Sequence, residues 1–239
     1  MHNIETEVED IFLYIRAKLY GHTIFKKENA FCNFLVKLVY KIYGKHFKNS
    51  LDYNYFAHHF NNTFFLKNLL KSLLFFYDNS ILIENHIIDI GCGAAPSSIA
   101  IANIALKKYN DRIKVDLIDK SSVQLCLAKE FLNVLDIKSN SYTNFFDFNN
   151  ESFEGLVVFS YFLCEQNSTF IEELYNCIDK FKYGFVVIDY KENINKLEKY
   201  FFKNNQKINI HFLHYNLSQT LSEILNESEI HVYGCYYKP

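Results

Sequence analysis

The sequence has no tryptophan, one methionine and no marked excess of charge of either sign. Its 239 residues carry 25 basic and 27 acidic side chains, a formal net charge of −2. The charge balance therefore gives no global sign of a nucleic-acid-binding protein. The sequence also lacks an apolar run of about 18 residues, so we expect no membrane span. The first twelve residues are acidic and lack an apolar core, so we expect no secretory signal.

Paired cysteines are also missing. The six cysteines form no C-x-x-C pair and no Cys/His cluster with zinc-ligand spacing, so the sequence predicts no metal site. His211 and His214 are three residues apart on an expected strand, where they point to opposite faces and cannot share one ion without a bend. Unpaired cysteines favour a reducing compartment, and we expect a cytoplasmic protein.

Two regions of the chain differ in pattern. Residues 1–80 contain only two glycines, and their apolar residues recur at helical spacing, which predicts an N-terminal helical subdomain of three or four helices. Residues 81–239 alternate between apolar runs and helical segments, which predicts a second, α/β domain. Its strands are expected at 86–91, 113–119, 155–161 and 183–190 and near 141–146, and its helices at 97–108, 121–135 and 191–203 and near 169–181. Two further strand-like runs, 210–216 and 230–237, are close enough in sequence to pair antiparallel.

A glycine-containing turn follows the first expected strand. In IIDIGCGAAP (87–96), Asp89, Gly91, Gly93 and Ala95 follow the spacing D-x-G-x-G-x-small, with Cys92 between the glycines. Glycine permits positive φ and lets backbone N–H groups approach a ligand closely. In an open α/β sheet, ligands bind at the carboxyl ends of the strands. The turn therefore predicts a nucleotide-like ligand, with Asp89 ordering the loop and reaching the ligand through water.

The same turn excludes two common nucleotides. The NAD fingerprint G-x-G-x-x-G would place its third glycine at Pro96, whose ring and missing N–H hinder the approach of a pyrophosphate. The P-loop pattern G-x-x-x-x-G-K-[ST] is absent, which argues against a standard ATP or GTP site.

The second expected strand ends in a carboxylate. VDLID (115–119) places Asp119 at the sheet edge, followed by Lys120 and Ser121. A carboxylate there can accept hydrogen bonds from two ribose hydroxyls. The alternative is that Asp119 or Ser121 caps the following helix.

Residues 85–190 resemble class I, Rossmann-like S-adenosylmethionine (SAM) dependent methyltransferases. IIDIGCGAAP is similar to the first motif of that family, VDLID to the second, NFFDFNN (144–150) to the adenine-side segment and LVVFSYFLCEQ (156–166) to the fourth. The resemblance implies SAM as cofactor. It also implies an α/β fold with a doubly wound, mostly parallel seven-stranded sheet whose last strand is antiparallel.

The resemblance also implies roles for individual residues. Asp147 and Phe148 would lie beside the adenine, although an Asp–Asn turn is the alternative. Ser160 and Tyr161 would face the sulfonium, with Tyr161 as a positioning group. Glu165 is the best candidate for a general base, and a helix cap is its alternative.

Three functions remain open. The leading hypothesis is methyl transfer to a small-molecule or protein-borne acceptor, with residues 1–80 as a lid for substrate recognition. The second is an RNA, perhaps ribosomal, methyltransferase, because LVVFSYFLCEQ also has a weaker similarity to Rsm-type ribosomal methyltransferase-like proteins. A basic stripe that could bind phosphates supports it: Lys37, Lys41, Lys45 and Lys48. The third is a non-catalytic SAM-binding subunit. The sequence does not indicate an oligomeric state.

Overall fold

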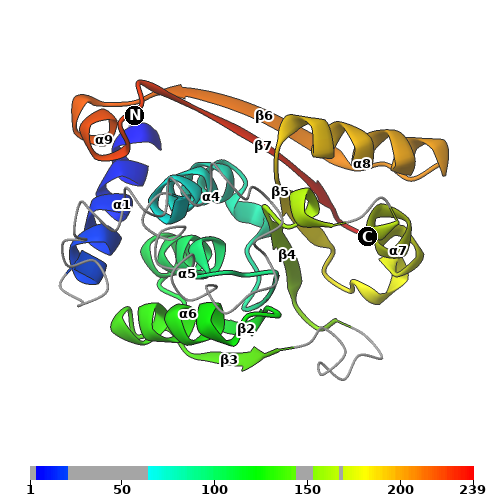
Figure 1. Cartoon of the computed structure of the whole chain (residues 1–239), viewed down its shortest axis with the longest axis horizontal. Helices are drawn as coiled ribbons and strands as arrows, with labels where there is room; N and C mark the ends of the chain where they lie inside the picture. The colour runs from blue at the N-terminus through cyan, green and yellow to red at the C-terminus, as the bar shows by residue number, and fades with distance from the viewer. Residues whose placement is uncertain (1–3, 21–63, 144–152, 167–168) are drawn as a thin grey trace, which may run out of the picture.

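The computed structural model describes residues 4–20, 64–143, 153–166 and 169–239, and within them a seven-stranded sheet of order β3-β2-β1-β4-β5-β7-β6 (Figure 1). Neighbouring strands from β3 to β5 are parallel, and β7 is antiparallel to both β5 and β6. The strands are β1 (His86–Ile90), β2 (Lys114–Ile118), β3 (Ser139–Tyr142), β4 (Leu156–Ser160), β5 (Phe185–Ile188), β6 (Asn209–Asn216) and β7 (Glu229–Tyr237). The predicted doubly wound sheet with an antiparallel last strand is confirmed.

Helices cover both faces of the sheet. One hydrophobic cluster contains α1 (Ile4–Tyr20), α4 (Leu66–Asp78), α5 (Pro96–Tyr109) and α6 (Ser122–Val134), and a second contains α7 (Phe170–Asn176) and α8 (Lys191–Lys203). Successive strand residues alternate between the clusters: Ile87 and Val158 belong to the first, Ile88 and Val157 to the second. This alternation follows from the two-residue period of a strand. Figure 1 shows α4, α5 and α6 side by side, away from α7 and α8.

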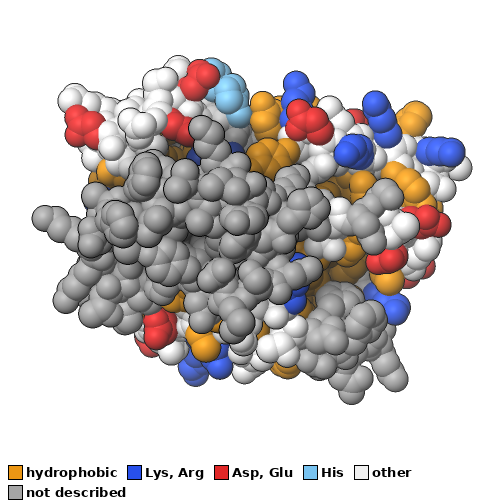
Figure 2. Space-filling view, in the orientation of Figure 1, with side chains coloured by type: hydrophobic (Ala, Val, Ile, Leu, Met, Phe, Trp, Pro, Cys, Tyr) orange, Lys and Arg blue, Asp and Glu red, His pale blue; other side chains and the backbone are white. Residues whose placement is uncertain are grey.

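The central strands form because their side chains are apolar on both sides. β1, β2, β4 and β5 are buried along almost their whole lengths, as expected for parallel strands that lie between two helical layers. The helices are amphipathic in return. In α8, Ile194, Leu197 and Phe201 are buried, while Figure 2 shows Lys side chains over the outer surface of this helix.

The parallel strands end at one edge of the sheet. Ile90 at the end of β1 pairs with Ile118 at the end of β2, and Ser160 at the end of β4 pairs with Ile188 at the end of β5. The loops after these four strands therefore meet at the carboxyl edge, where open α/β sheets bind ligands.

Helices α1 and α4 belong to the same hydrophobic cluster as α5 and α6. Ser72 of α4 and Ser97 of α5 share a buried hydrogen bond of 2.7 Å between their hydroxyl oxygens. Residues 21–63 lie outside the described part of the chain, so the division into a helical subdomain (1–80) and an α/β domain (81–239) stays a prediction. No helix in the described ranges has both the length and the apolar character needed to cross a membrane.

Three elements differ clearly from the prediction. The third strand covers 139–142 rather than 141–146. The helix expected near 169–181 is divided into α7 and a short 3₁₀ helix, η7 (Ile178–Lys180). The segment between β6 and β7, expected to be a loop, contains α9 (Gln219–Leu225), whose first turn is capped by Ser218 accepting a hydrogen bond from the Leu221 N–H at 3.2 Å.

Candidate functional site

The turn between β1 and α5 lies at the carboxyl edge of the sheet. Gly91, Gly93 and Ala95 have φ angles of 67°, 53° and 60°, in the left-handed region that is costly for residues with a Cβ. The Gly91 N–H donates to the carbonyl oxygen of Ile118 at 2.7 Å, which joins the turn to the end of β2. Helix α5 then begins at Pro96, one residue before the expected start at Ser97.

The two glycines of the turn have different surroundings. A Cβ added at Gly91 would lie 2.1 Å from Cδ2 of Phe162, so this ring covers Gly91. A Cβ added at Gly93 would meet no described heavy atom within 4 Å. Among the described residues the turn is therefore open at Gly93, while Phe162 covers it at Gly91.

Asp119 connects the turn to the next helix. Its Oδ2 accepts a hydrogen bond from the Gly93 N–H at 2.9 Å, and its Oδ1 accepts one from the Ser121 N–H at 2.8 Å. The cap of α6 is Ser121, whose hydroxyl oxygen accepts from the Gln124 N–H at 3.3 Å. Each carboxylate oxygen has two lone pairs and can accept more than one hydrogen bond. Lys120 follows it in an exposed position.

Asp89 is fully buried at the base of the turn. The Ser98 hydroxyl donates to its Oδ2 at 2.6 Å, and its Oδ1 has no hydrogen-bond partner among the described residues. Burial raises the pKa of the Asp89 carboxyl to about 7, against the lowering effect of the hydrogen bonds from Ser98, and nearby Asp119 adds to the rise. The neighbouring Cys92 is buried too, and burial raises the pKa of its thiol well above the usual range, so it is no thiolate nucleophile.

The raised pKa of Asp89 predicts a pH-dependent stability. Because the folded protein binds this proton more tightly than the unfolded chain, the stabilisation is complete below about pH 4 and is lost as the pH rises through about 7. Asp89→Asn cannot ionise and keeps an acceptor for Ser98. We expect its stability advantage over the wild type to grow by about 2–3 kcal/mol between pH 5 and pH 8, measured by urea unfolding. If the difference in stability between Asp89→Asn and the wild type did not change with pH, the raised pKa of the buried Asp89 carboxyl would be wrong.

The end of β4 lies at the same carboxyl edge, on the other side of β1 from β2. Ser160 has a buried hydroxyl oxygen without a hydrogen-bond partner among the described residues. Tyr161 has a φ of 55°, which costs about 1–2 kcal/mol for a residue with a side chain, and its N–H donates to the carbonyl oxygen of Ile188 at 2.7 Å. Strained backbone of this kind is concentrated at functional sites. Burial, and then the charge of Asp189, raises the pKa of the Tyr161 phenol well above its usual range, so its hydroxyl stays protonated.

Lys71 of α4 also lies at this edge, beside Tyr161, and it was not predicted as a site residue. Its Nζ lies 5.2 Å from the centroid of the Tyr161 ring. Burial, and then the charge of Lys67, lowers the pKa of Lys71 to about 8, although Glu227 and Asp189 act in the opposite direction. A signal was available in the sequence, because Lys71 interrupts the apolar run from Leu69 to Tyr77 of a largely buried helix.

Asp189 and Tyr190 complete this group from the end of β5. Asp189 is buried, and its Oδ1 accepts hydrogen bonds from the Tyr190 N–H and from Asn193 Nδ2, both at 2.7 Å. Its Oδ2 accepts from the Cys164 N–H at 3.3 Å, which joins the β4 and β5 loops. The Tyr190 and Tyr161 rings make an edge-to-face contact with centroids 5.7 Å apart. An aspartate directly after the apolar run FVVI was the signal for this residue, as it was for Asp119.

Several predicted residues have no described placement. Glu165 belongs to the short 3₁₀ helix η6 (Leu163–Glu165) after β4, but its side chain is outside the described part of the chain. The adenine-side residues and the basic stripe also lie outside it: Asp147, Phe148, Lys37, Lys41, Lys45 and Lys48. Their roles stay predictions.

No protein-family model and no curated protein matches the sequence. Solved structures with a similar arrangement include the plantazolicin methyltransferase BpumL in complex with SAH (11% identity, 98% of each chain, TM-score 0.49). A second is a precorrin-6y C5,15-methyltransferase of Geobacter metallireducens (14% identity, covering 66% of this chain and 87% of that one, TM-score 0.47). A third is a ribosomal protein L11 methylase of Lactobacillus delbrueckii subsp. bulgaricus (11% identity, covering 72% of this chain and 79% of that one, TM-score 0.48). These similarities are low, so the architecture is established by this chain's own strand order, and the candidate site is described from its own residues.

Proposed function

We propose that the protein is a SAM-dependent methyltransferase whose cofactor lies over Gly93 at the carboxyl edge of the sheet. The observation that carries this proposal is the turn itself, which has positive φ angles and, as far as the described residues go, open space at Gly93 where a side chain would stand. A ligand without phosphates suits this turn, because Pro96 at the start of α5 provides no N–H for a pyrophosphate.

The remaining residues of the edge fit the parts of this cofactor. Asp119 is assigned to the ribose hydroxyls, and its hydrogen bond to the Gly93 N–H holds the carboxylate next to the open turn. Asp89, with one unpartnered oxygen among the described residues, is assigned to the ammonium group through water. The other residues that we expect beside the cofactor complete the proposed site: Cys92, Lys120, Asp147, Phe148 and Ser160.

SAM supplies an electrophilic methyl group on a sulfonium, and the protein's own residues position the acceptor and receive its proton. Proximity and orientation provide much of the rate in such an in-line transfer. The protonated hydroxyl of Tyr161 is suited to donate a hydrogen bond that orients the acceptor. Lys71, with a pKa of about 8, exchanges a proton near neutral pH and joins Glu165 as a candidate base for an acceptor that must be deprotonated.

The acceptor we propose is a small molecule or a protein-borne group, covered by residues 1–80 as a lid. The RNA hypothesis depends on lysines outside the described residues, and the non-catalytic hypothesis requires SAM binding without transfer. Both stay open as alternatives. We also propose a cytoplasmic location, and the free thiols of Cys92, Cys126, Cys177 and Cys235 are in keeping with a reducing compartment.

Replacement of Asp119 tests the proposed ribose contact. Asp119→Ala is expected to weaken SAM binding by about 1–3 kcal/mol, as for the loss of a charged hydrogen-bond acceptor. Titration calorimetry measures the effect. Asp111→Ala is the matched control, because it removes an exposed carboxylate that precedes β2 instead of following it. Unchanged affinity in Asp119→Ala would limit Asp119 to holding the two loops together.

A further inference from the structure

A second group of chemically reactive side chains lies on the ribbon formed by β6 and β7. Residues 229–233 of β7 pair with β6 but not with β5, so this end of the ribbon extends past the edge of the central sheet. His214 of β6 is directly opposite His231 of β7, and Asn216 is opposite Glu229. Glu229 and His231 are two residues apart on one strand, so their side chains share a face with the cross-strand neighbour His214.

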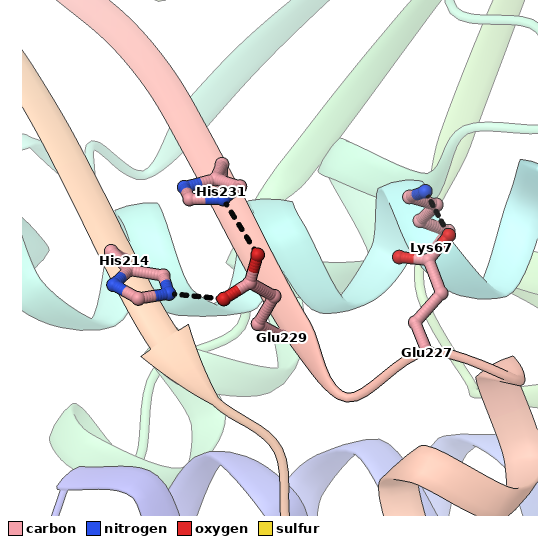
Figure 3. A network of polar contacts seen from close by, with 5 residues as sticks. All are labelled: Lys67, His214, Glu227, Glu229 and His231. Atoms are coloured by element: carbon pink, nitrogen blue, oxygen red, sulfur yellow. Dashed lines mark hydrogen bonds and ion pairs between the residues drawn. The ribbon is translucent and has the colours of Figure 1, made fainter.

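The three side chains converge on one point. His214 Nε2 lies 3.0 Å from Oε2 of Glu229, and His231 Nε2 lies 3.4 Å from Oε1 (Figure 3). One nitrogen of each imidazole and a carboxylate oxygen all lie within 4.8 Å of one another. The side chains of His214, Glu229 and His231 are 51%, 53% and 47% exposed, respectively. An ion in solution can therefore reach all three. Figure 2 shows histidine side chains at the surface along the edge where Figure 1 draws the ribbon.

These separations match the requirements of a transition-metal ion. A tetrahedral zinc ion with bonds of about 2.0–2.1 Å holds its ligand atoms about 3.3 Å apart. Each imidazole nitrogen lies close to that distance from one oxygen of Glu229, at 3.0 Å from Oε2 for His214 and at 3.4 Å from Oε1 for His231. Two imidazoles and one carboxylate are also a donor set that zinc accepts, with a fourth position left for water or another ligand.

The two imidazole rings stack across the ribbon. The rings of His214 and His231 are nearly parallel, at 13°, with centroids 4.6 Å apart. A neutral imidazole can donate from one ring nitrogen, so hydrogen bonds to Glu229 need no charged ring. A metal ion at the same point would instead be bound by the lone pairs of two neutral imidazoles. The adjoining ion pair between Lys67 and Glu227 uses a different carboxylate and leaves Glu229 to the histidines.

We propose that His214, Glu229 and His231 form a surface site for a divalent transition-metal ion, best suited to zinc, that bridges β6 and β7. The site goes beyond the proposed methyl transfer and does not depend on it. The sequence did not reveal it because only His211 and His214 were compared, and they point to opposite faces. The strand register places His231 opposite His214, although His231 lies 17 residues further along the chain.

A zinc titration of metal-free protein against a chromophoric chelator tests the site. We expect one equivalent of zinc to bind with a dissociation constant of about 10 µM or tighter. We expect His214→Ala and His231→Ala each to weaken binding at least tenfold, and Glu229→Gln to weaken it severalfold. The matched controls are His211→Gln, on the same strand and the other face, and Glu223→Gln, an exposed carboxylate of α9; both are expected to bind as the wild type does.

Cobalt absorption separates this site from zinc bound by the exposed cysteines Cys126 and Cys164. A site made of nitrogen and oxygen ligands gives visible cobalt bands without a thiolate charge-transfer band, and these bands should disappear in His231→Ala. The three side chains are exposed, so circular dichroism should find the variants folded. The proposal is overturned if folded wild-type protein binds no zinc below about 0.1 mM, or if the His214 and His231 variants bind it as tightly as the wild type.

Discussion

The Gly93→Ala variant is expected to fold but to lose at least nine-tenths of its affinity for SAM. The added Cβ meets no described atom within 4 Å, so its cost to folding is limited to the left-handed backbone, about 1–2 kcal/mol. The same Cβ would stand in the space that we assign to the cofactor. A tenfold to hundredfold loss of affinity corresponds to about 1.4–2.8 kcal/mol of binding free energy.

Titration calorimetry with SAM, together with urea unfolding of the same preparation, measures both quantities. A folded variant with reduced affinity is the result that the proposed geometry requires. If Gly93→Ala binds SAM as the wild type does, the cofactor does not lie over Gly93 and the proposed site is wrong.

The Gly91→Ala variant, two residues away, is expected to fail for a different reason. Here the new Cβ would lie 2.1 Å from Cδ2 of Phe162, at a φ of 67°. Overpacking of this contact costs about 1–3 kcal/mol, and the left-handed backbone adds about 1–2 kcal/mol. We therefore expect a loss of about 2–5 kcal/mol in the free energy of unfolding, measured by urea denaturation.

A double-mutant cycle identifies the cause of that loss. Phe162→Ala removes the ring that the new Cβ would meet, so Gly91→Ala should cost less in a Phe162→Ala background than in the wild type. The remaining cost should be that of the backbone alone. Equal costs in the two backgrounds would mean that Phe162 does not cover Gly91. Phe162 also contacts Phe159 and Phe170, so Phe162→Ala has its own effect on stability, which the cycle subtracts.

The central strands and the glycine turn were predictable because local sequence determines them. Apolar runs such as LVVF and FVVI have no polar face, so they favour strands buried between two layers, and β4 and β5 are such strands. The turn was recognisable because Gly91 and Gly93 occupy left-handed positions and Pro96 begins a helix. Ala95 also adopts a left-handed φ of 60°, so this position favours glycine, and the alanine is a genuine departure from the preferred residue.

The bounds of strand β3 were misplaced and helix α9 was missed, because their sequences carry little pattern. Strand β3 reads SNSY and lies at the edge of the sheet, half-exposed, so no apolar alternation marks its ends. Helix α9 has only seven residues and one fully buried side chain, Leu221, too few for a periodic signal. Both elements depend on tertiary contacts rather than on local preference.

The site itself was predictable only in part, because its members come from separate segments. Asp89 is the last but one residue of β1 and Asp119 directly follows β2, so the parallel arrangement places them at one edge. Lys71 reaches that edge from α4, and its contact with Tyr161 results from how the helix packs on the sheet. Such a contact cannot be derived from spacing along the chain.

Titration calorimetry of the full-length wild-type protein with SAM is the most direct test of the central claim, with S-adenosylhomocysteine and NAD as parallel ligands. We predict saturable binding of one equivalent of SAM and of S-adenosylhomocysteine in the micromolar range, and no comparable binding of NAD. Folded protein that binds neither SAM nor S-adenosylhomocysteine below millimolar concentration would contradict the proposed function.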